Sequence, residues 1–417
     1  MSVIQPFTHA CRIARWLICG GIVLGGIAPG RLSLAQGGAG CNAPAVEPVL
    51  HIPLPGYPFT PVVSADGCWV FVALVGDGKG ATSGVAVLRR SGGTMSVVRA
   101  VPLKSSGTGA VLTHDGRTLV VAAGARVAFL DAARLISGAG DPVLGYLDVG
   151  EGAAAIYVNV TRDDETLFVA LERAASILVV DMAKIRARMF TDAAVVGRIP
   201  VGQGPVAVTL SNDGKYLYTT SQTAPPLWKW PVECKPEGRD PAKAQPEYAK
   251  GAVVVVDVAR ARTDPAKSVV ARVPVGCNPV RLVTSPDGGT AWITTRGDHA
   301  IVAVDTGRLL RDPAQAIAAR IPVGTAPVGI AVVDGGRRVI ATNSNRFAGD
   351  ANDRQSLNVV DVSRGAANAA FLGLVPAGAF PRELCVSPDG RTLFVGNFAS
   401  KTLQVIDLAR LAPQKAP

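Results

Sequence analysis

One sequence pattern recurs seven times along the chain. Two clear copies are VPVGCNPVRLVTSPDGGTAWITT from Val273 and IPVGTAPVGIAV from Ile321. Successive copies start about 46 to 54 residues apart, except for a longer fourth copy. The copies begin near Ile52, Val101, Leu147, Ile199, Val273, Ile321 and Val375. A length of 417 residues would otherwise suggest two or three domains, but a repeat of this period indicates one repeat architecture.

Each copy predicts four short strands. A first strand runs into an Asp-Gly turn, a second follows, a third reads like VVVVDVAR, and a fourth ends at the next PVG. The 46 Gly and 30 Pro suit short strands joined by tight turns. One four-stranded meander cannot cover both of its faces, but seven stacked around an axis can. We therefore expect an all-β protein, a seven-bladed β-propeller of four-stranded antiparallel blades.

Aspartate recurs at two turn positions of the repeat. In the first turn it tolerates the positive φ of a tight hairpin, and at the end of the third strand it can accept hydrogen bonds from the following turn. Recurrence once per blade indicates a structural role rather than a catalytic or metal-binding array. The first-turn residues are Asp66, Asp115, Asp163, Asp213, Asp287 and Asp389, and the third-strand residues are Asp131, Asp181, Asp257, Asp305, Asp361 and Asp407.

The two ends of the repeat region complement each other. The last copy ends after its third strand at VIDLARLAPQKAP, whereas PVLHIPLPG near Pro48 has the pattern of a fourth strand. We expect this N-terminal strand to complete the last blade, which removes an exposed sheet edge.

The N-terminus has the pattern of a secretory signal. Arg12 and Arg15 precede an apolar run of about 12 residues, too short to span a bilayer, and small residues follow at Ser33 and Ala35. A lipoprotein interpretation would use Cys41, which lies beyond the apolar run and lacks the usual preceding Leu.

These features predict the domain organisation and the destination of the chain. We expect a signal peptide at 1–35, a lead segment at 36–47, and a single propeller at 48–417 with a long insertion at 222–250. The mature protein would have no transmembrane span and would be periplasmic or secreted.

The basic charge is spread along the chain. The formal net charge of +10 includes three arginines of the predicted signal, so about +7 remains after its removal. Aromatic residues make up only 5%, and no run of Lys or Arg accompanies them. Electrostatic binding of nucleic acid or an acidic polymer is therefore a minor hypothesis.

The repeat PVG..P..I..SPDG..L.V.N followed by a V.V.D strand resembles the YVTN-type β-propeller family. Good local matches are IPVGQGPVAVTLSNDGKYLYTTS from Ile199 and VPAGAFPRELCVSPDGRTLFVGN from Val375, and the resemblance runs from about Pro48 to Arg410. It implies a relationship to exported YncE-like propellers and surface-layer propellers, with lactonase-type propellers as relatives. Propellers host many functions, so the resemblance implies a fold rather than a reaction.

No cofactor motif accompanies this resemblance. The sequence has no CxxCH for c-type haem and no recurrent Trp motif of quinoprotein type. After the predicted signal, His51, His114 and His299 lie in separate copies, which argues against a multi-histidine metal site. We expect no cofactor and no metal.

Irregular insertions occur at positions that belong to one face of the ring. Turns alternate between the two ends of a meander, so the loops between second and third strands share a face with the links between blades, here called the upper face. Such insertions are either binding loops or tolerated drift. In the insertion of the fourth copy, Trp228, Trp230 and Tyr248 would either anchor a partner or fix the loop to its own blade. The insertions are GDGKGATSG from Gly76, residues 222–250, and RFAGDANDRQS from Arg346.

Near the channel mouth, two charged residues stand among small ones at the start of the inner strands. The positions that we align are Thr60, Gly109, Ala155, Ala207, Arg281, Gly329 and Glu383. Arg281 and Glu383 are the charged members, and they form either an ordinary salt bridge or part of a ligand-binding patch for an anionic group or a polar peptide. The other candidate ligand-binding residues are Arg382, Arg296, His299, Asn343, Arg346 and Asn397.

Five cysteines follow the predicted signal, and export favours disulfides. Cys234 and Cys277 belong to upper-face loops of adjacent blades and are one candidate pair. Cys41 and Cys68 form a second, weaker candidate pair. Cys385 lies in an inner strand and is expected to be a buried free thiol, and no Cys-His-Asn arrangement indicates catalysis.

The pattern favours a binding protein over an enzyme. We expect an exported scaffold, monomeric, whose upper face recognises a protein, peptide or cell-envelope component. The alternative is a lactonase-like hydrolase that uses a metal at the channel mouth, for which Glu383 is the one evident inner-strand carboxylate.

Overall fold

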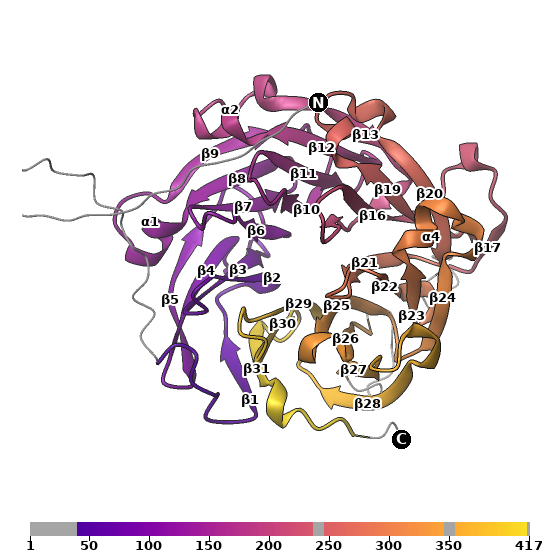
Figure 1. The fold of residues 1–417 in the computed structure, drawn as a ribbon. Coiled ribbons are helices and arrows are strands. Elements are labelled where there is room, and N and C mark those ends of the chain that lie inside the picture. Colours follow the sequence, from indigo (N-terminus) through magenta and orange to yellow (C-terminus); the bar gives the residue numbers. More distant parts are fainter. Residues whose placement is uncertain (1–39, 237–245, 346–354, 415–417) are drawn as a thin grey trace, which may run out of the picture. The chain divides into compact units, whose positions relative to one another are not determined.

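The computed structural model describes residues 40–236, 246–345 and 355–414. The chain divides into two units, Met1–Gln36 and Gly37–Pro417, and only the second contains described residues, so the predicted signal lies outside them. Within the second unit, seven antiparallel sheets surround a central axis (Figure 1). This arrangement confirms the predicted seven-bladed propeller.

The strands of blades 1 to 4 follow the predicted order, from the axis outward. The inner strand of blade 4 is split into two short segments. Blade 1 consists of β2 (Tyr57–Val63), β3 (Trp69–Val75), β4 (Gly84–Ser91) and β5 (Thr94–Pro102); blade 2 of β6 (Ala110–Leu112), β7 (Thr118–Ala123), β8 (Arg126–Asp131) and β9 (Val143–Asp148); blade 3 of β10 (Ala155–Val160), β11 (Thr166–Leu171), β12 (Ser176–Asp181) and β13 (Val195–Pro200); blade 4 of β14 (Gln203–Pro205) with β15 (Thr209–Leu210), β16 (Tyr216–Thr223), β19 (Gly251–Asp257) and β20 (Val269–Gly276).

Blades 5 to 7 repeat the same order, and the outer strand of blade 7 comes from the N-terminal end of the described region. Blade 5 consists of β21 (Pro279–Thr284), β22 (Thr290–Thr295), β23 (Ala300–Asp305) and β24 (Ile317–Pro322); blade 6 of β25 (Pro327–Val333), β26 (Arg338–Asn343), β27 (Ser356–Asp361) and β28 (Ala370–Pro376); blade 7 of β29 (Pro381–Val386), β30 (Thr392–Asn397), β31 (Thr402–Asp407) and β1 (Val49–Pro53).

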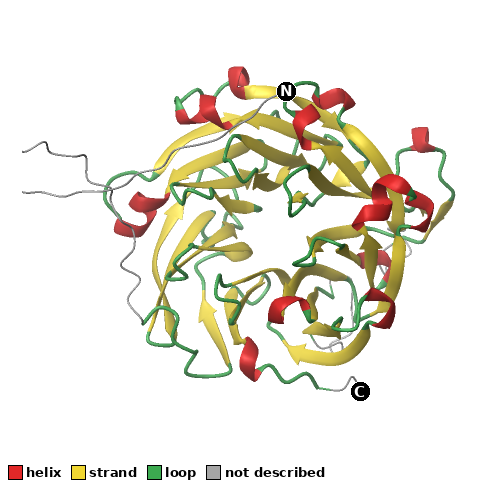
Figure 2. Ribbon diagram, in the orientation of Figure 1, coloured by secondary structure: helices red, strands yellow, loops and turns green. Residues whose placement is uncertain are grey.

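Short helices join the strands (Figure 2), several of them directly after a third strand. The aspartate that ends the third strand caps the following turn: Asp131 accepts from Arg134 N at 3.0 Å and Asp257 from Arg260 N at 2.8 Å. Among the described residues, no helix has both the length and the apolar character needed to cross a membrane. The helices are α1 (Ala132–Ser137), α2 (Met182–Arg186), α3 (Val258–Ala261), α4 (Thr306–Arg311), η1 (Asp192–Ala194), η2 (Pro226–Trp228), η4 (Pro265–Lys267), η5 (Arg296–Asp298), η6 (Pro313–Gln315), η7 (Asp334–Gly336), η8 (Ala366–Asn368) and η9 (Leu408–Arg410).

The first-turn aspartates organise the hairpins between the first and second strands. In blade 4, Asp213 Oδ1 accepts from Ser211 Oγ at 2.6 Å and from Lys215 N at 3.1 Å. The next residue has positive φ, 72° at Gly214, and blade 3 places Asp164 there at 55°. The recurring carboxylates at both turn positions are thus structural, as the repeat predicts.

The hydrophobic core is divided among the contacts between neighbouring blades. Seven clusters of buried side chains each combine residues of two adjacent blades, including blade 7 with blade 1. Phe129, Phe168 and Phe394 are fully buried in three of these clusters. Burial of one such ring contributes about 1.5–3 kcal/mol, so stability depends on every blade having two neighbours.

Threonines near the ends of second strands link successive inner strands. Thr220 Oγ1 donates to Val280 O at 2.8 Å, Thr294 to Val328 O at 2.7 Å, and Thr342 to Arg382 O at 2.8 Å. These bonds connect blades 4 to 7 in sequence beside the central channel. They hold the carbonyls of three channel-lining residues in place.

The ring is closed by the N-terminal strand. β1 pairs with β31 in antiparallel register, with Leu50 opposite Val405. A disulfide joins Cys41 to Cys68, with Cα atoms 4.9 Å apart, and thereby attaches the lead segment to blade 1. Arg90 of blade 1 also donates to Thr392 Oγ1 of blade 7 at 3.0 Å. The predicted closure and the second predicted disulfide are both confirmed.

Candidate ligand site at the channel mouth

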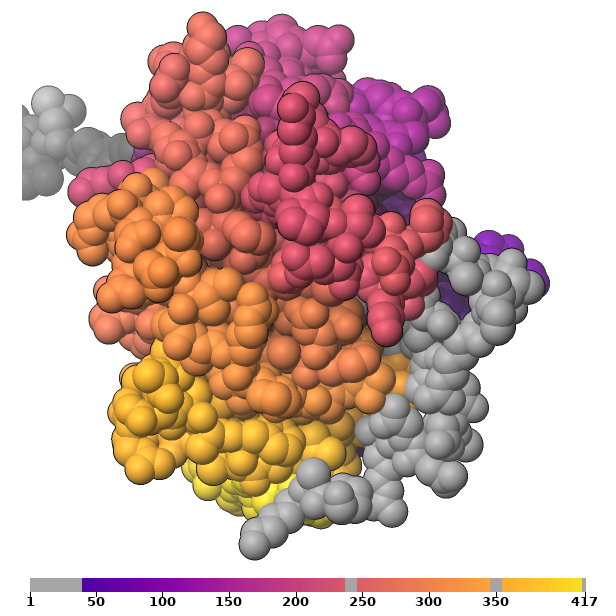
Figure 3. Space-filling view, turned by 90° about the vertical axis from the view of Figure 1, so that its right-hand side faces the viewer, coloured from indigo at the N-terminus to yellow at the C-terminus, as the bar shows by residue number. Residues whose placement is uncertain are grey.

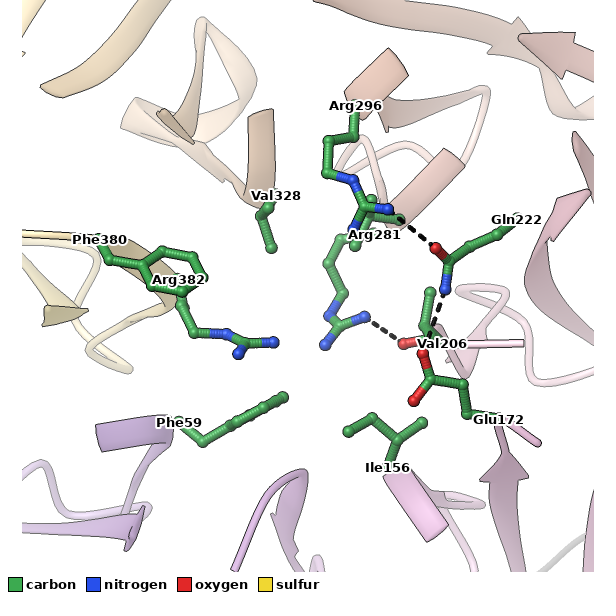
Figure 4. Close-up of a pocket in the computed structure, with 11 residues that line it drawn as sticks. Phe59, Ile156, Glu172, Val206, Gln222, Arg281, Arg296, Val328, Phe380 and Arg382 are labelled. Atoms are coloured by element: carbon green, nitrogen blue, oxygen red, sulfur yellow. Dashed lines mark hydrogen bonds between the residues drawn. The ribbon is translucent and has the colours of Figure 1, made fainter. Parts of the chain in front are cut away.

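A cavity of about 190 Å³ lies where the inner strands begin, at the upper face (Figure 4). Blades 1, 3, 4, 5, 6 and 7 all contribute side chains to it. Its lining residues are Phe59, Ile156, Glu172, Val206, Gln222, Val280, Arg281, Arg296, Val328, Phe380 and Arg382. Three of the predicted binding residues, Arg281, Arg296 and Arg382, are therefore brought together.

The alignment of the inner strands needs one correction. In β10, Tyr157 pairs with Ala170 after a bulge, and it occupies the position that Arg281 occupies in β21. Ala155 lies two residues earlier, opposite Leu171. The error arose because blade 3 lacks the Pro that opens most other inner strands. The distance to the first-turn aspartate was the better signal, since Tyr157 precedes Asp163 by the same six residues that separate Arg281 from Asp287.

Arg281 and Glu383 form a buried ion pair across blade 6. Arg281 Nη2 lies 2.6 Å from Glu383 Oε1, and their side chains are 6% and 4% exposed. Arg281 Nη1 also donates to Val206 O. The pair is a salt bridge, which is one of the two predicted interpretations, and its Arg281 side chain also lines the cavity.

The ion pair between Arg281 and Glu383 can cross blade 6 because the residue of blade 6 at this position is Gly329, which has no side chain. A Cβ atom on Gly329 would collide with Arg382 O and would lie 3.2 Å from Glu383 Cα. The inner strands of blades 6 and 7 therefore approach at a distance that only glycine permits.

Tyr157 covers the other side of the Arg281 guanidinium. The Arg281 Cζ atom lies 4.4 Å from the centre of the Tyr157 ring. Burial raises the pKa of Tyr157, and the negative charge of Glu383 raises it further, so the phenol stays protonated. Cys385, in the same inner ring, is a free thiol as predicted, but it is only partly buried rather than fully so.

Arg382 extends over a group of phenylalanine rings. Its Cζ atom lies 4.0 Å from the centre of the Phe59 ring and 5.3 Å from the centres of both the Phe380 and Phe398 rings. Figure 4 shows the Arg382 and Arg281 guanidinium groups pointing toward each other inside the cavity. Cation–π contacts orient the Arg382 guanidinium while leaving its edge toward the cavity.

A hydrogen-bonded chain runs along the opposite wall. Arg296 Nη2 donates to Gln222 Oε1 at 3.1 Å, and Gln222 Nε2 donates to Glu172 Oε1 at 3.3 Å. These residues follow or end the second strands of blades 5, 4 and 3. Sequence reasoning identified Arg296 but missed Gln222 and Glu172, although both stand at the matching end of a second strand.

The rest of the wall is apolar. Val206, Val280 and Val328 are 4%, 5% and 4% exposed and pack together, with Ile156 beside them. They come from equivalent positions of blades 4, 5, 6 and 3. The cavity therefore has a small aliphatic side next to its arginines.

Three other predicted residues have structural contacts. Asn343 Nδ2 donates to Ser356 Oγ at 2.8 Å, and Asn397 Nδ2 donates to Gln404 Oε1 at 3.2 Å, so both amides bond within their own blades. His299 Nδ1 accepts from Ala326 N at 3.0 Å. None of these three lines the cavity. Arg346 lies outside the described residues.

The insertion of blade 4 spreads from the upper face over the outer rim, where its residues are crimson in Figure 3. It contains η2 and the hairpin of β17 (Val232–Cys234) and β18 (Tyr248–Ala249). Trp228 and Trp230 have ring centres 5.0 Å apart and are half-buried against the core between blades 3 and 4. The two tryptophans thus fix the insertion to its own blade.

The insertion is also attached to blade 5. Cys234 forms the predicted disulfide with Cys277, with Cα atoms 5.6 Å apart. Asn278 Nδ2 donates to Tyr248 Oη at 2.7 Å, and Asn278 O accepts from Arg296 N at 3.0 Å. A continuous set of bonds therefore connects the insertion to a residue of the cavity wall.

The described part of the cavity wall has few histidine, cysteine and acidic side chains. Within residues 40–236, 246–345 and 355–414, no group of three or more such side chains could hold a metal ion. The two glutamates near the cavity, Glu172 and Glu383, are each engaged with other side chains.

Comparisons with known proteins find similarity of fold. No family model and no curated protein matches the chain. A chain of the hydrazine synthase of Kuenenia stuttgartiensis is 20% identical with a TM-score of 0.63, covering 85% of this chain and 96% of that one. A chain of the mitotic checkpoint complex is 15% identical with a TM-score of 0.61, covering 87% and 94%. At these identities the likeness supports the propeller fold alone.

Proposed function

We propose that this protein is an exported propeller scaffold whose upper face recognises a protein, peptide or cell-envelope component. The observation that carries the proposal is that two features lie on the same face. One is a cavity with polar and apolar walls, and the other is an insertion held to the next blade by a disulfide. Regular blades need neither feature. Loops held on a rigid ring suit recognition because little order is lost on binding.

Two further features support the proposal. Disulfides persist in oxidising compartments, so the two bridges fit an exported protein. The repeat motif resembles the YVTN-type family, and we infer a relationship to its exported members from that motif.

The lactonase-like alternative has less support. It requires carboxylates and amides that converge on a metal at the channel mouth. Glu383 is instead paired with Arg281, and the amides of Asn343 and Asn397 bond within their blades. The described wall of the cavity favours binding without covalent chemistry.

The proposal is tested with a bead-displayed library of short peptides and the disulfide-bonded mature protein. Hydrogen exchange then identifies the regions of the protein that a bound peptide protects. We expect protection in the upper-face loops and at the starts of the inner strands. Protection confined to the turns between first and second strands, on the opposite face, would contradict the proposal.

A matched pair of loop variants completes this test. Replacing residues 225–249 by Asn-Gly, together with Cys277→Ser, should weaken peptide binding about tenfold or more if the insertion contributes contacts. Shortening the loop at 137–141, which lies on the opposite face, serves as the control and should leave binding unchanged.

A further inference from the structure

We propose that a groove on the outer rim of the ring, between blades 1 and 2, binds a proline-containing turn of a partner protein. This inference goes beyond the proposed function, because it concerns the rim rather than the upper face. The groove has a volume of about 640 Å³ and lies between the outer strands β5 and β9, which are neighbours in Figure 1. Residues 100–104 form one wall, and residues 141–143 with Tyr146 form the other. We call it the rim groove.

Other junctions between blades show which side chains cover the rim in this chain. Between blades 3 and 4, the buried Pro265 lies against β13, and a Cβ atom on Gly197 would be 3.1 Å from Pro265 Cγ. Between blades 2 and 3, a Cβ atom on Gly145 would clash with the ring of Phe190. Each of these covers belongs to the link between the third and fourth strands of the following blade. A proline or an aromatic ring therefore fits this position.

The corresponding link of blade 2 is too short to cover blade 1 in the same way. In blades 4 and 5, an Asp-Pro pair begins the turns η4 and η6, and residues 266–268 and 314–316 then precede the outer strand. In blade 2, Pro142 is followed directly by Val143, which already pairs with Leu130 of β8. The rim groove thus lies where blades 4 and 5 have a turn that begins with proline.

The outer strand of blade 1 also differs at the position that faces this link. Arg99 stands there, and a Cβ atom on Gly138 would clash with its guanidinium group, so Arg99 extends toward blade 2. Blades 2 to 6 have glycine or alanine at this position, which leaves room for a cover from the next blade. The equivalent residues are Gly145, Gly197, Ala271, Ala319 and Gly373. Contact at this position therefore runs from blade 1 to blade 2, the reverse of the two covers described above.

Apolar side chains are uncovered in the rim groove. Val101 of β5 is only partly buried, whereas the equivalent residues of blades 2 to 6 are buried. Those residues are Leu147, Ile199, Val273, Ile321 and Val375. The Tyr146 ring forms part of the opposite wall, and its Oη accepts from Lys104 N at 3.4 Å. Aromatic-lined grooves of this kind suit proline-containing segments.

Opposite charges flank the rim groove. Lys104, beyond the end of β5, and Asp141, before the start of β9, are both exposed. The partner turn is therefore expected to carry an acidic residue for Lys104 and a basic residue for Asp141. The turn η4 already has this composition, since Asp264 and Lys267 flank Pro265 and form an ion pair at 3.4 Å.

The test uses the intact disulfide-bonded protein and a library of disulfide-closed peptides with a fixed central proline. A second library has glycine in place of the proline. Each library is selected on the parent protein and counter-selected on a filled variant, in which Ala-Lys-Ser is inserted between Pro142 and Val143 and Arg99→Gly makes room for the new turn. We expect the proline library to yield about tenfold more binders than the glycine library, with acidic residues enriched. Bound peptides should protect residues 98–104 and 141–147 from hydrogen exchange.

Point variants test the rim groove without a change of loop length. Val101→Asn should weaken binding of a selected peptide about tenfold, whereas Val196→Asn, at a 38% exposed valine in the outer strand of blade 3, should change it less than about twofold. Lys104→Glu should weaken binding of a selected acidic peptide and strengthen binding of the same peptide with its acidic residue changed to lysine. A gain of affinity cannot result from misfolding.

Three results would overturn the inference. Equal recovery from the two libraries would show that the rim groove does not recognise proline. Selected peptides that bind the filled variant as tightly as the parent would have their site elsewhere on the protein. Recovery of no peptide that distinguishes the parent from the filled variant would show that the rim groove binds no such turn.

Discussion

At the scale of single residues, the turn aspartates determine how stability depends on pH. Asp163 is the clearest example. Burial alone would raise its pKa, but hydrogen bonds from Thr161 and Arg262 and the positive charge of Arg262 lower it from 3.8 to about 2. The Arg262 Nη2 atom lies 2.7 Å from Asp163 Oδ2, which connects blade 4 to blade 3.

This lowered pKa predicts a pH-dependent effect of Asp163→Asn. The folded state binds the proton more weakly than the unfolded state, so the stabilising contribution is complete above about pH 4 and disappears as the pH falls toward about 2. The variant should be less stable by about 1 kcal/mol at pH 7, since the pair is half-exposed, and the difference should shrink on acidification. Urea unfolding from pH 7 to pH 3 measures it. Asp192→Asn, at a side chain without hydrogen bonds among the described residues, is the control, and a difference that grows on acidification would refute the assignment.

The residue scale also shows where sequence reasoning reached its limit. Arg281, Arg382 and Arg296 could be predicted to share the channel mouth because the repeat gives their blade positions. The phenylalanines around Arg382 were missed because sequence reasoning looked for polar side chains at the channel mouth, although Phe59 and Phe398 stand at the repeat positions of Val280 and Arg296. Tyr157 was misaligned because a bulge changes the spacing at the start of β10.

At the scale of structural elements, the blade-4 insertion behaves as a brace. The Cys234–Cys277 disulfide closes a segment of 43 residues, and the adjacent Asn278 holds the backbone of Arg296. Both cysteine pairs could be predicted because topology assigns each loop to a face. The packing of Trp228 and Trp230 on their own blade could not, since a loop pattern does not specify which surface its aromatic residues cover.

The brace predicts a stability effect of its removal. Replacing Cys234 and Cys277 together by serine should destabilise the protein by about 2–4 kcal/mol, because the unfolded chain regains the freedom of the closed segment. Cys385→Ser is the control for loss of a thiol and should cost less. Urea unfolding without reductant measures both variants. If the double variant were as stable as the parent, the insertion would not brace the ring.

At the scale of the whole molecule, stability depends on closure. Each core cluster lies between two blades, so an open ring would leave one blade face uncovered at each end. Closure could be predicted from the missing fourth strand of the last repeat. The hydrogen bond from Arg90 to Thr392, which joins blade 1 to blade 7 independently of β1, had no sequence signal.

Closure leads to a prediction about the N-terminal strand. A chain that begins at Pro55, with Cys68→Ser, loses β1 and the packing of Leu50, Ile52 and Leu54 on blades 1 and 7. We expect a loss of about 4–6 kcal/mol from these side chains, together with self-association through the exposed edge of β31. A chain that begins at Gln36, with Cys41→Ser and Cys68→Ser, keeps the strand and should lose only about 3 kcal/mol. Unfolding in urea and sedimentation velocity distinguish the two.

A transplanted strand separates the role of β1 from its position in the sequence. β1 is antiparallel to β31, with Val49 opposite Ile406, so residues 48–54 joined after Pro413 by a short Gly-Ser linker can return along the same edge. This rearranged chain, also beginning at Pro55, should regain most of the stability lost by truncation and should remain monomeric, because the ring needs the strand but not its N-terminal connection. A folded rearranged chain that stays as unstable as the truncated one would show that the link from β1 into blade 1, rather than closure of blade 7, carries the stabilisation.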